Sequence, residues 1–359
     1  MAKLRVGIIG AGQMASLHAE AYAKSSEAEI YAVCDRREEV AVARSLEWGA
    51  QRYMLDYREL LADPQVDAVE ILTPHHLHQE MAVSAAQARK HIHLAKPLAT
   101  SLRGAEAVLH EVERNRVVLQ VSEPMMHFPP FRQAKAFIDA GELGNLVSLR
   151  MKVTVGSPEG AWDVRPDAWL WRLDPSRCGG GPLLFDQGYH KLAMALLLGG
   201  PVEQVRAWSG RTEIHAGYFL DSPTLINWKH MAPNRFGSLE LSYAPQLYVR
   251  SNTYPHVESI ELTGSRGILW INQGCARVHD ASALQVYREG RIYGFNDLED
   301  DWREAVYSSV HNFVKAALGQ GEPTMSAAEA LRVLRFTVAA KDAGQSGASV
   351  AVADRRFAS

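Results

Sequence analysis

The first third of the chain alternates short apolar runs with longer segments in which apolar residues recur every three to four positions. The runs are residues 4–10, 29–35, 66–73, 91–96 and 117–123, each of a length typical of a buried strand. The segments between them are residues 13–25, 37–48, 57–63, 78–88 and 101–115, which have the spacing of helices. This alternation predicts an α/β fold, a doubly wound parallel sheet with helices on both faces.

The pattern changes after about residue 122. A helix is predicted over residues 129–140, followed by segments with a period of two such as LVSLRMKVTV, VEQVRAWSG, TLINWKH, GSLELSYA, SIELTGSRGILWIN and ALQVYREGRIYGF. Further helices are expected over residues 182–198, 302–317 and 327–343. We therefore predict two domains, residues 1–122 and 123–359. The second is of α+β type with an open, mainly antiparallel sheet, and the closing helix can pack back near the first domain.

Composition excludes several classes of protein. The 359 residues include 38 Lys and Arg against 41 Asp and Glu, so no basic excess is available for nucleic acid. Three cysteines without a CxxC pair suit a reducing compartment and argue against a structural metal site. No apolar run approaches the ~18 residues of a membrane span, and the first strand begins too early for a signal peptide. We expect a cytoplasmic protein without membrane or nucleic-acid partners.

A glycine-rich turn follows the first predicted strand and opens the first helix. Its residues Gly10-Ala-Gly12-Gln13-Met14-Ala15 fit the GxGxxG/A pattern of a Rossmann fold, in which glycines bring the backbone close to a pyrophosphate. Asp35 ends the second strand about 20 residues later, where an acid binds the ribose 2′-hydroxyl. NAD is the expected cofactor. NADP stays open, because Arg36 or its neighbour could pair with a 2′-phosphate.

Two further groups of residues lie where ligands bind at the carboxyl ends of parallel strands. Thr73, Pro74 and three histidines up to His78 follow the third strand, and Lys96 ends the fourth. The histidines have no nearby Cys, Asp or Glu set to complete a metal site, so we expect helix capping or cofactor contacts from them. Lys96, beside the nucleotide, is expected to act on substrate.

A second glycine run, residues 179–181, precedes the helix predicted from Pro182. Asp186 and His190 are four positions apart and therefore share one face of that helix. A carboxylate and an imidazole so placed can bind a hydroxyl group and move its proton. A structural Asp–His pair is the alternative.

These motifs together resemble the Gfo/Idh/MocA oxidoreductases, the glucose–fructose oxidoreductase and inositol dehydrogenase group. The resemblance rests on GIIGAGQMASLHAEAY, on the segment from YRELLADPQ to HIHLAKPLA, on GELGNLVSLR and on WRLDPSRCGGGPLLFDQGYH. It implies an N-terminal Rossmann domain and a C-terminal domain whose open sheet often forms the oligomer surface. It also implies Lys96, Asp186 and His190 as the catalytic residues for oxidation of a secondary alcohol on a sugar-like ring.

The chain departs from the family pattern at two positions. The family motif Glu-Lys-Pro reads Ala95-Lys96-Pro97 here, and Arg89 stands where the family has glycine in Ala-Gly-Lys-His. If the missing carboxylate normally contacts the lysine, its loss lowers the pKa of Lys96. The direction or pH optimum of the reaction could then differ.

Candidate substrate-binding residues surround the catalytic set. His127 follows the last strand of the first domain, and four more precede the glycine run, namely Trp162, Arg165, Trp171 and Arg172. Aromatic rings can pack on sugar rings while Arg and Asp bind hydroxyls, although the tryptophans could equally be core residues.

The sequence leaves other functions open. One is a glycoside-cleaving enzyme that oxidises, eliminates and recycles its NAD; another is a non-catalytic nucleotide-binding regulator, or a reductase of another substrate. We also expect a homodimer or homotetramer formed through the C-terminal sheet.

Overall fold

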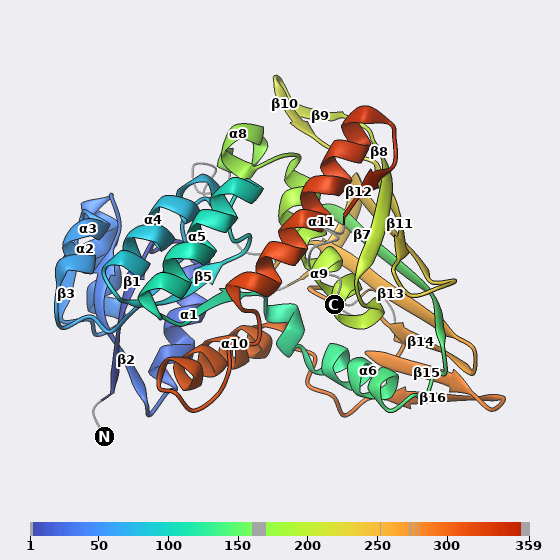
Figure 1. Ribbon diagram of the computed structural model, residues 1–359, viewed down its shortest axis with the longest axis horizontal. Helices are drawn as coiled ribbons and strands as arrows, with labels where there is room; N and C mark the ends of the chain where they lie inside the picture. Colours follow the sequence, from blue (N-terminus) through green and yellow to red (C-terminus); the bar gives the residue numbers. More distant parts are fainter. Residues whose placement is uncertain are drawn as a thin grey trace. The chain divides into compact units, whose positions relative to one another are not determined.

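The computed structural model describes residues 3–159, 170–251, 253–272, 274–276, 278 and 280–352. The chain folds into two compact units (Figure 1). Unit 1 takes residues 1–127, 176–179 and 303–334, and unit 2 takes residues 128–175, 180–302 and 335–359. The division into residues 1–122 and 123–359 stays a prediction. The compact units change at residue 127 and interleave further along the chain.

Unit 1 is built on a parallel sheet of six strands in the order β3-β2-β1-β4-β5-β6, which confirms the predicted Rossmann-type sheet. The strands are β1 (Leu4–Ile9), β2 (Ala28–Cys34), β3 (Arg52–Met54), β4 (Ala68–Ile71), β5 (His91–Ala95) and β6 (Leu119–Ser122). The sequence pattern missed β3. Two of its three residues are exposed, so it has no apolar run to mark it.

Helices cover both faces of this sheet. Val6 and Ile8 of β1 pack against α1 and against α10 from the end of the chain. The position between them, Gly7, points the other way, where a Cβ would meet Leu60 of α3. The helices that lie wholly or mostly in this unit are α1 (Gln13–Ala23), α2 (Glu38–Glu47), α3 (Tyr57–Ala62), α4 (His75–Gln87), α5 (Leu102–Asn115), η1 (Pro124–His127), α8 (Pro175–Cys178) and α10 (Trp302–Ala317). Helix α4 begins three residues earlier than the helix predicted from residue 78.

Unit 2 is built on a nine-stranded sheet in the order β16-β15-β14-β13-β7-β12-β11-β8-β17. All neighbours are antiparallel except β7 and β12, which confirms the open, mainly antiparallel sheet. Its strands are β7 (Leu146–Glu159), β8 (Val202–Ser209), β11 (Thr224–His230), β12 (Phe236–Arg250), β13 (His256–Gly264), β14 (Gly267–Ile271), β15 (Leu284–Arg288), β16 (Arg291–Phe295) and β17 (Val350–Ala351). A separate hairpin, not predicted, joins β9 (Thr212–His215) to β10 (Tyr218–Leu220).

The remaining helices are α6 (Pro129–Asp139), η2 (Leu170–Leu173), η3 (Leu183–Gly188), α9 (Tyr189–Gly199) and α11 (Ala327–Ser346), of which α11 begins in unit 1 and ends in unit 2. Helix α6 lies beside β14 (Figure 1). The helix predicted over residues 182–198 is present, and its first part, η3, is wound as a π-helical turn that continues directly into α9. Such turns recur where helices carry functional side chains, and this one carries Asp186.

Candidate active site

The turn between β1 and α1 has two glycines that the fold treats differently. Gly10 has φ +90°, and a Cβ there would lie 2.8 Å from the carbonyl oxygen of Leu72, so the chain itself requires glycine. Gly12 has φ −78°, and a Cβ there would meet nothing within 4 Å in the described part of the chain. The chain therefore leaves space over Gly12. That space fits the approach of a pyrophosphate to the backbone at the start of α1.

The start of α1 is open to an anion in two further respects. Gln13 and Met14 form its first turn, which has neither an acidic residue nor a side-chain cap among the described residues.

Asp35 lies at the end of β2 and accepts hydrogen bonds from the backbone N–H groups of Ala11 and Arg37, at 3.1 and 3.0 Å. Its carboxylate is thus fixed beside the glycine turn, which fits the binding of ribose hydroxyls.

The two arginines after Asp35 have different environments. The Nε atom of Arg37 lies 3.4 Å from Asp35 Oδ1, whereas Arg36 is exposed. Arg37 is therefore drawn to the carboxylate, and Arg36 is the residue that extends into solvent.

His78 links the loops after β4 and β5. Its two ring nitrogens lie 2.7 Å from the carbonyl oxygen of Pro97 and 2.8 Å from that of Thr73. Burial lowers the pKa of His78 to about 4, although both carbonyl contacts oppose this and the charge of Lys96 adds to it. A neutral ring can donate to only one of the two carbonyls. His78 therefore positions the loops that carry Thr73, Pro74 and Lys96.

Lys96 follows β5, and Glu123 follows the neighbouring strand β6. Ala95 pairs with Ser122 in the parallel register, so Lys96 and Glu123 each stand one residue beyond that pair. The Glu123 side chain is buried and accepts a hydrogen bond from the backbone N–H of Met125, at 3.2 Å. The sequence reasoning missed Glu123. The signal was available, because this acid ends a predicted strand next to the one that ends at Lys96.

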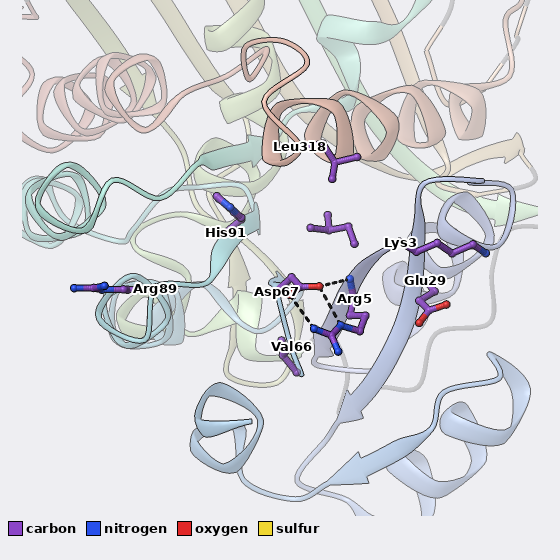
Figure 2. Close-up of a pocket in the computed structure, with 9 residues that line it drawn as sticks. Lys3, Arg5, Glu29, Val66, Asp67, Arg89, His91 and Leu318 are labelled. Atoms are coloured by element: carbon purple, nitrogen blue, oxygen red, sulfur yellow. Dashed lines mark hydrogen bonds and ion pairs between the residues drawn. The ribbon is translucent and has the colours of Figure 1, made fainter. Parts of the chain in front are cut away.

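A cavity of about 720 Å³ opens at the opposite edge of the same sheet (Figure 2). Its lining comes largely from the amino-terminal ends of the parallel strands, including Arg5, Glu29, Asp67 and His91. Arg5 and Asp67 pair with each other there, with Nε and Oδ2 3.2 Å apart. Ligands of open α/β sheets bind at the carboxyl edge, so this cavity does not belong to the candidate site.

In unit 2, the structure brings Arg172 of η2 and Asp186 of η3 together. Arg172 Nε donates to Asp186 Oδ2 at 2.7 Å, and the Asp186 side chain is largely buried. The guanidinium of Arg172 also stacks over the ring of Trp171, with its carbon 4.4 Å from the ring centroid. Asp186 is therefore held as a carboxylate in a defined orientation.

His190 lies in the first turn of α9, four residues beyond Asp186, and is half-buried. Burial raises the pKa of Tyr254 to about 12, against an opposing effect of the Arg172 charge. Tyr254 stacks on His256 of β13, with ring centroids 5.4 Å apart. Burial likewise lowers the pKa of His256 to about 4, an effect opposed by Glu258 and Asp186. These two side chains are neutral at neutral pH.

Asp221, which lies between β10 and β11, anchors the helix that carries Asp186 and His190. Its two carboxylate oxygens accept hydrogen bonds from the backbone N–H groups of Leu183 and Leu184, at 2.7 and 2.9 Å. A Cβ at Gly181 would overlap the Asp221 side chain, so glycine is required beside it. Sequence reasoning missed this cap, since a cap that comes from 37 or 38 residues away leaves no local pattern.

The other predicted substrate-binding residues are placed as follows. His127 ends η1 in unit 1, and Trp171 is buried under Arg172 in unit 2. Trp162 and Arg165 lie outside the described residues. Unit 1 therefore holds Gly10, Gly12, Asp35 and Lys96, and unit 2 holds Arg172, Asp186 and His190.

The parallel sheet, the open glycine turn and the fixed acid after β2 define a dinucleotide-binding α/β protein. Two family models match the chain. Residues 4–123 match a model described as an oxidoreductase family with an NAD-binding Rossmann fold, and residues 131–269 match the GFO/IDH/MocA C-terminal domain. The chain belongs to the GFO/IDH/MocA oxidoreductases. This confirms the predicted family, and NAD as the cofactor that the family binds.

The curated relatives include sugar and inositol dehydrogenases. The chain is 32% identical over 216 residues to a levoglucosan dehydrogenase from Pseudarthrobacter phenanthrenivorans, an alignment that spans 58% of this chain and only 54% of that protein. It is 25% identical over 343 residues to a myo-inositol 2-dehydrogenase from Thermotoga maritima, spanning 94% and 95% of the two. The solved structure of a levoglucosan dehydrogenase with NADH and levoglucosan has the same fold, with a TM-score of 0.82, 24% identity, and coverage of 98% and 100%.

Proposed function

We propose that this protein is an NAD-dependent dehydrogenase that oxidises a secondary hydroxyl group of a sugar, cyclitol or glycoside. The observation that carries the proposal is the buried Asp186 carboxylate, fixed by Arg172 at 2.7 Å and one helical turn from His190. An uncharged polyol offers hydroxyl donors to such a carboxylate and a proton to such an imidazole. The names of the relatives, a levoglucosan dehydrogenase and a myo-inositol 2-dehydrogenase, support the same substrate class.

Each residue has a distinct role in the proposed mechanism. Asp186 accepts a hydrogen bond from the substrate and orients the hydroxyl group that reacts. His190 takes the proton of that hydroxyl as general base and returns it in the reverse direction. The Lys96 ammonium group donates to the same oxygen and stabilises the developing alkoxide. Bound NAD supplies the hydride acceptor.

Other residues are assigned to the binding of NAD or of the substrate. Gly10, Gly12, Gln13 and Met14 cradle the pyrophosphate, while Asp35 binds the ribose of NAD and disfavours a 2′-phosphate. Further contacts to the cofactor are assigned to Arg36, Thr73, Pro74 and His78. Contacts to the substrate are assigned to His127, Trp162, Arg165, Trp171 and Arg172.

Glu123 supplies a carboxylate in place of the motif glutamate, which this chain replaces with Ala95. It is buried, and it stands level with Lys96 at the carboxyl edge of the sheet. We assign it the role of the missing glutamate, a negative charge at the strand end next to the one that carries Lys96.

The test measures NADH formation at 340 nm with purified protein, NAD and a panel of levoglucosan, inositols, sugars and glycosides. We expect turnover with at least one of them. His190→Asn should lower kcat by about 10²–10⁴-fold while NAD still binds, and Lys96→Met by about 10²–10³-fold. The matched control is His215→Asn, since His215 is exposed on the β9–β10 hairpin. Tight NAD binding without turnover of any compound would refute the proposal.

The same panel separates the rival functions. A glycoside-cleaving enzyme that recycles NAD would release the aglycone without net NADH. A regulator would bind NAD and leave every compound unchanged.

We further propose that the protein is a cytoplasmic homo-oligomer. Several large apolar side chains are exposed on strands of the nine-stranded sheet, among them Trp208, Leu225, Phe236 and Ile292. An exposed apolar face of this kind needs a partner. Light scattering should give a dimer or tetramer, and Trp208→Glu with Phe236→Glu should dissociate it. The three cysteines Cys34, Cys178 and Cys275 form no disulfide with one another, which suits a reducing compartment. In the described part of the chain, no helix has the length and apolar character that crossing a membrane requires.

A further inference from the structure

The buried face of β13 changes character along the strand. Ile260 and Leu262 continue the apolar core of unit 2, but the two preceding positions on the same face are His256 and Glu258, both buried. A buried carboxylate is costly unless it is paired. Polar residues in place of apolar ones on a core face therefore call for a chemical reason.

The partner of Glu258 comes from the catalytic helix. Lys191 directly follows His190 in α9, and its Nζ atom lies 3.0 Å from Glu258 Oε2. The Lys191 side chain is only 1% exposed, and that of Glu258 8%. Gly274 completes the enclosure, because a Cβ at that position would overlap the Glu258 carboxylate. The pair is thus sealed from solvent. In such a buried place, charges act on their neighbours over several ångströms with little screening.

Two titratable side chains next to this pair, His256 and Cys275, are neutral and add no charge to it. His256 interacts electrostatically with Glu258, Asp186, Lys191 and His190, and is neutral because burial lowers its pKa to about 4. Burial also holds the pKa of the Cys275 thiol, which faces Glu258, well above its usual range.

Asp186 on η3 is matched by Arg172 on η2. The lysine next to His190 is matched by Glu258, whose pKa is raised by burial but lowered more by Lys191, His256 and His190.

We infer that the buried Lys191–Glu258 pair is a positioning device that sets the charge balance at His190, and so the pH at which His190 acts as a base. The inference rests on the proposed function for the role of His190. A positive charge beside an imidazole disfavours its protonated form, and a negative charge favours it. Lys191 alone would make His190 a weaker base, and Glu258 offsets this.

The charge balance predicts opposite effects for the two partners. Glu258→Gln leaves the ammonium group of Lys191 unmatched, so the titration of His190 should move to lower pH. Lys191→Met leaves the Glu258 carboxylate unmatched, so the titration of His190 should move to higher pH. The double variant removes both charges with little change in volume and should return the titration of His190 to near its original pH. A pair that merely held α9 against β13 would not give shifts of opposite sign.

The experiment is a pH titration of the full-length protein labelled with ¹³C at histidine Cε1, followed by NMR, with the His190 signal assigned by its absence in His190→Asn. The matched control is Lys229→Met, since Lys229 is an exposed lysine of the same unit and pairs with Glu203 at 2.7 Å. Opposite shifts in the single variants and restoration in the double variant are the expected result. Shifts of the same sign, or an unmoved His190, would overturn the inference.

Two features keep the test decisive. If Glu258→Gln does not fold, Lys191→Met is compared with the double variant, in which a buried ion pair is replaced by groups of similar size, a change that proteins often tolerate. The titration also needs no substrate. Opposite shifts without turnover of any polyol would refute the proposed function alone. Turnover whose acid limb does not move with the variants would overturn the inference alone.

Discussion

Glu70 is the acid at the centre of unit 1, and replacing it with glutamine tests how that unit is held together. Glu70 lies on β4 and is fully buried. Its carboxylate contacts His93 Nδ1 at 2.7 Å and His18 Nδ1 at 3.1 Å, and it accepts a hydrogen bond from the Tyr22 hydroxyl at 2.8 Å. The last two residues belong to α1, the helix that begins at Gly12. One carboxylate therefore ties this helix to β4 and β5.

The magnitude follows from the pKa of Glu70. Burial alone would raise it, but the attraction of His93 and His18 and their hydrogen bonds outweigh burial and lower it from 4.5 to about 2. Because the pKa of Glu70 is lower in the folded than in the unfolded chain, its ionised form stabilises the fold. This stabilisation is complete above pH 4.5 and is lost as the pH falls toward 2. The difference between the two pKa values corresponds to a free energy of unfolding of about 3 kcal/mol at pH 7 and about 1 kcal/mol near pH 3.

The assay is urea unfolding of wild type and Glu70→Gln at both pH values, with hydrogen exchange of amides in α1, β4 and β5 to locate the change. The expected loss is about 3–5 kcal/mol at pH 7, since one partner of a buried charged group is removed. The matched control is Glu80→Gln, because Glu80 pairs with Arg58 at an exposed site where such pairs contribute about 0–1 kcal/mol.

Two outcomes would refute this reasoning. One is a variant that is as stable as Glu80→Gln at pH 7. The other is a stability difference that does not shrink as the pH falls, because the carboxylate charge would then not be its source.

Four further predictions concern candidate site residues and their supports in unit 1 and in unit 2. Gly10→Ala should destabilise unit 1 by about 1–3 kcal/mol, because residue 10 has a positive φ. Gly12→Ala should leave the melting temperature of the protein unchanged and lower its affinity for NAD, measured by calorimetry. Equal losses of melting temperature in the two variants would contradict this. Asp35→Ala should weaken NAD binding and lower the ratio of the affinities for NAD and NADP in the same titrations. An unchanged affinity ratio would count against binding of the ribose by Asp35. Glu123→Gln should shift the pH–rate profile of the enzyme, which a residue without a role at the site would leave unmoved. Asp221→Ala should lower stability by about 1–2 kcal/mol, the cost of a lost cap, while Asp221→Asn, which keeps one acceptor oxygen, should lose less.

The sequence by itself determined the parallel sheet, the nucleotide turn and the family. These depend on local patterns, because a buried strand is mostly apolar and a backbone at positive φ favours glycine, as at Gly10. Local patterns did not predict an element whose residues are mostly exposed or a stabilising partner that lies far away along the chain. Strand β3 has two exposed residues of three, and η3 is held by Asp221 from beyond β10.

Only the tertiary structure decided which charges meet. The pairing of Arg172 with Asp186, of Lys191 with Glu258, and of Glu70 with two histidines joins residues 14, 67, 52 and 23 positions apart. No periodicity records such pairs, since each is made when different elements pack. Electrostatic energy depends on distance and burial in the folded chain, so the sequence named His190 as a base, while its surroundings came from the fold.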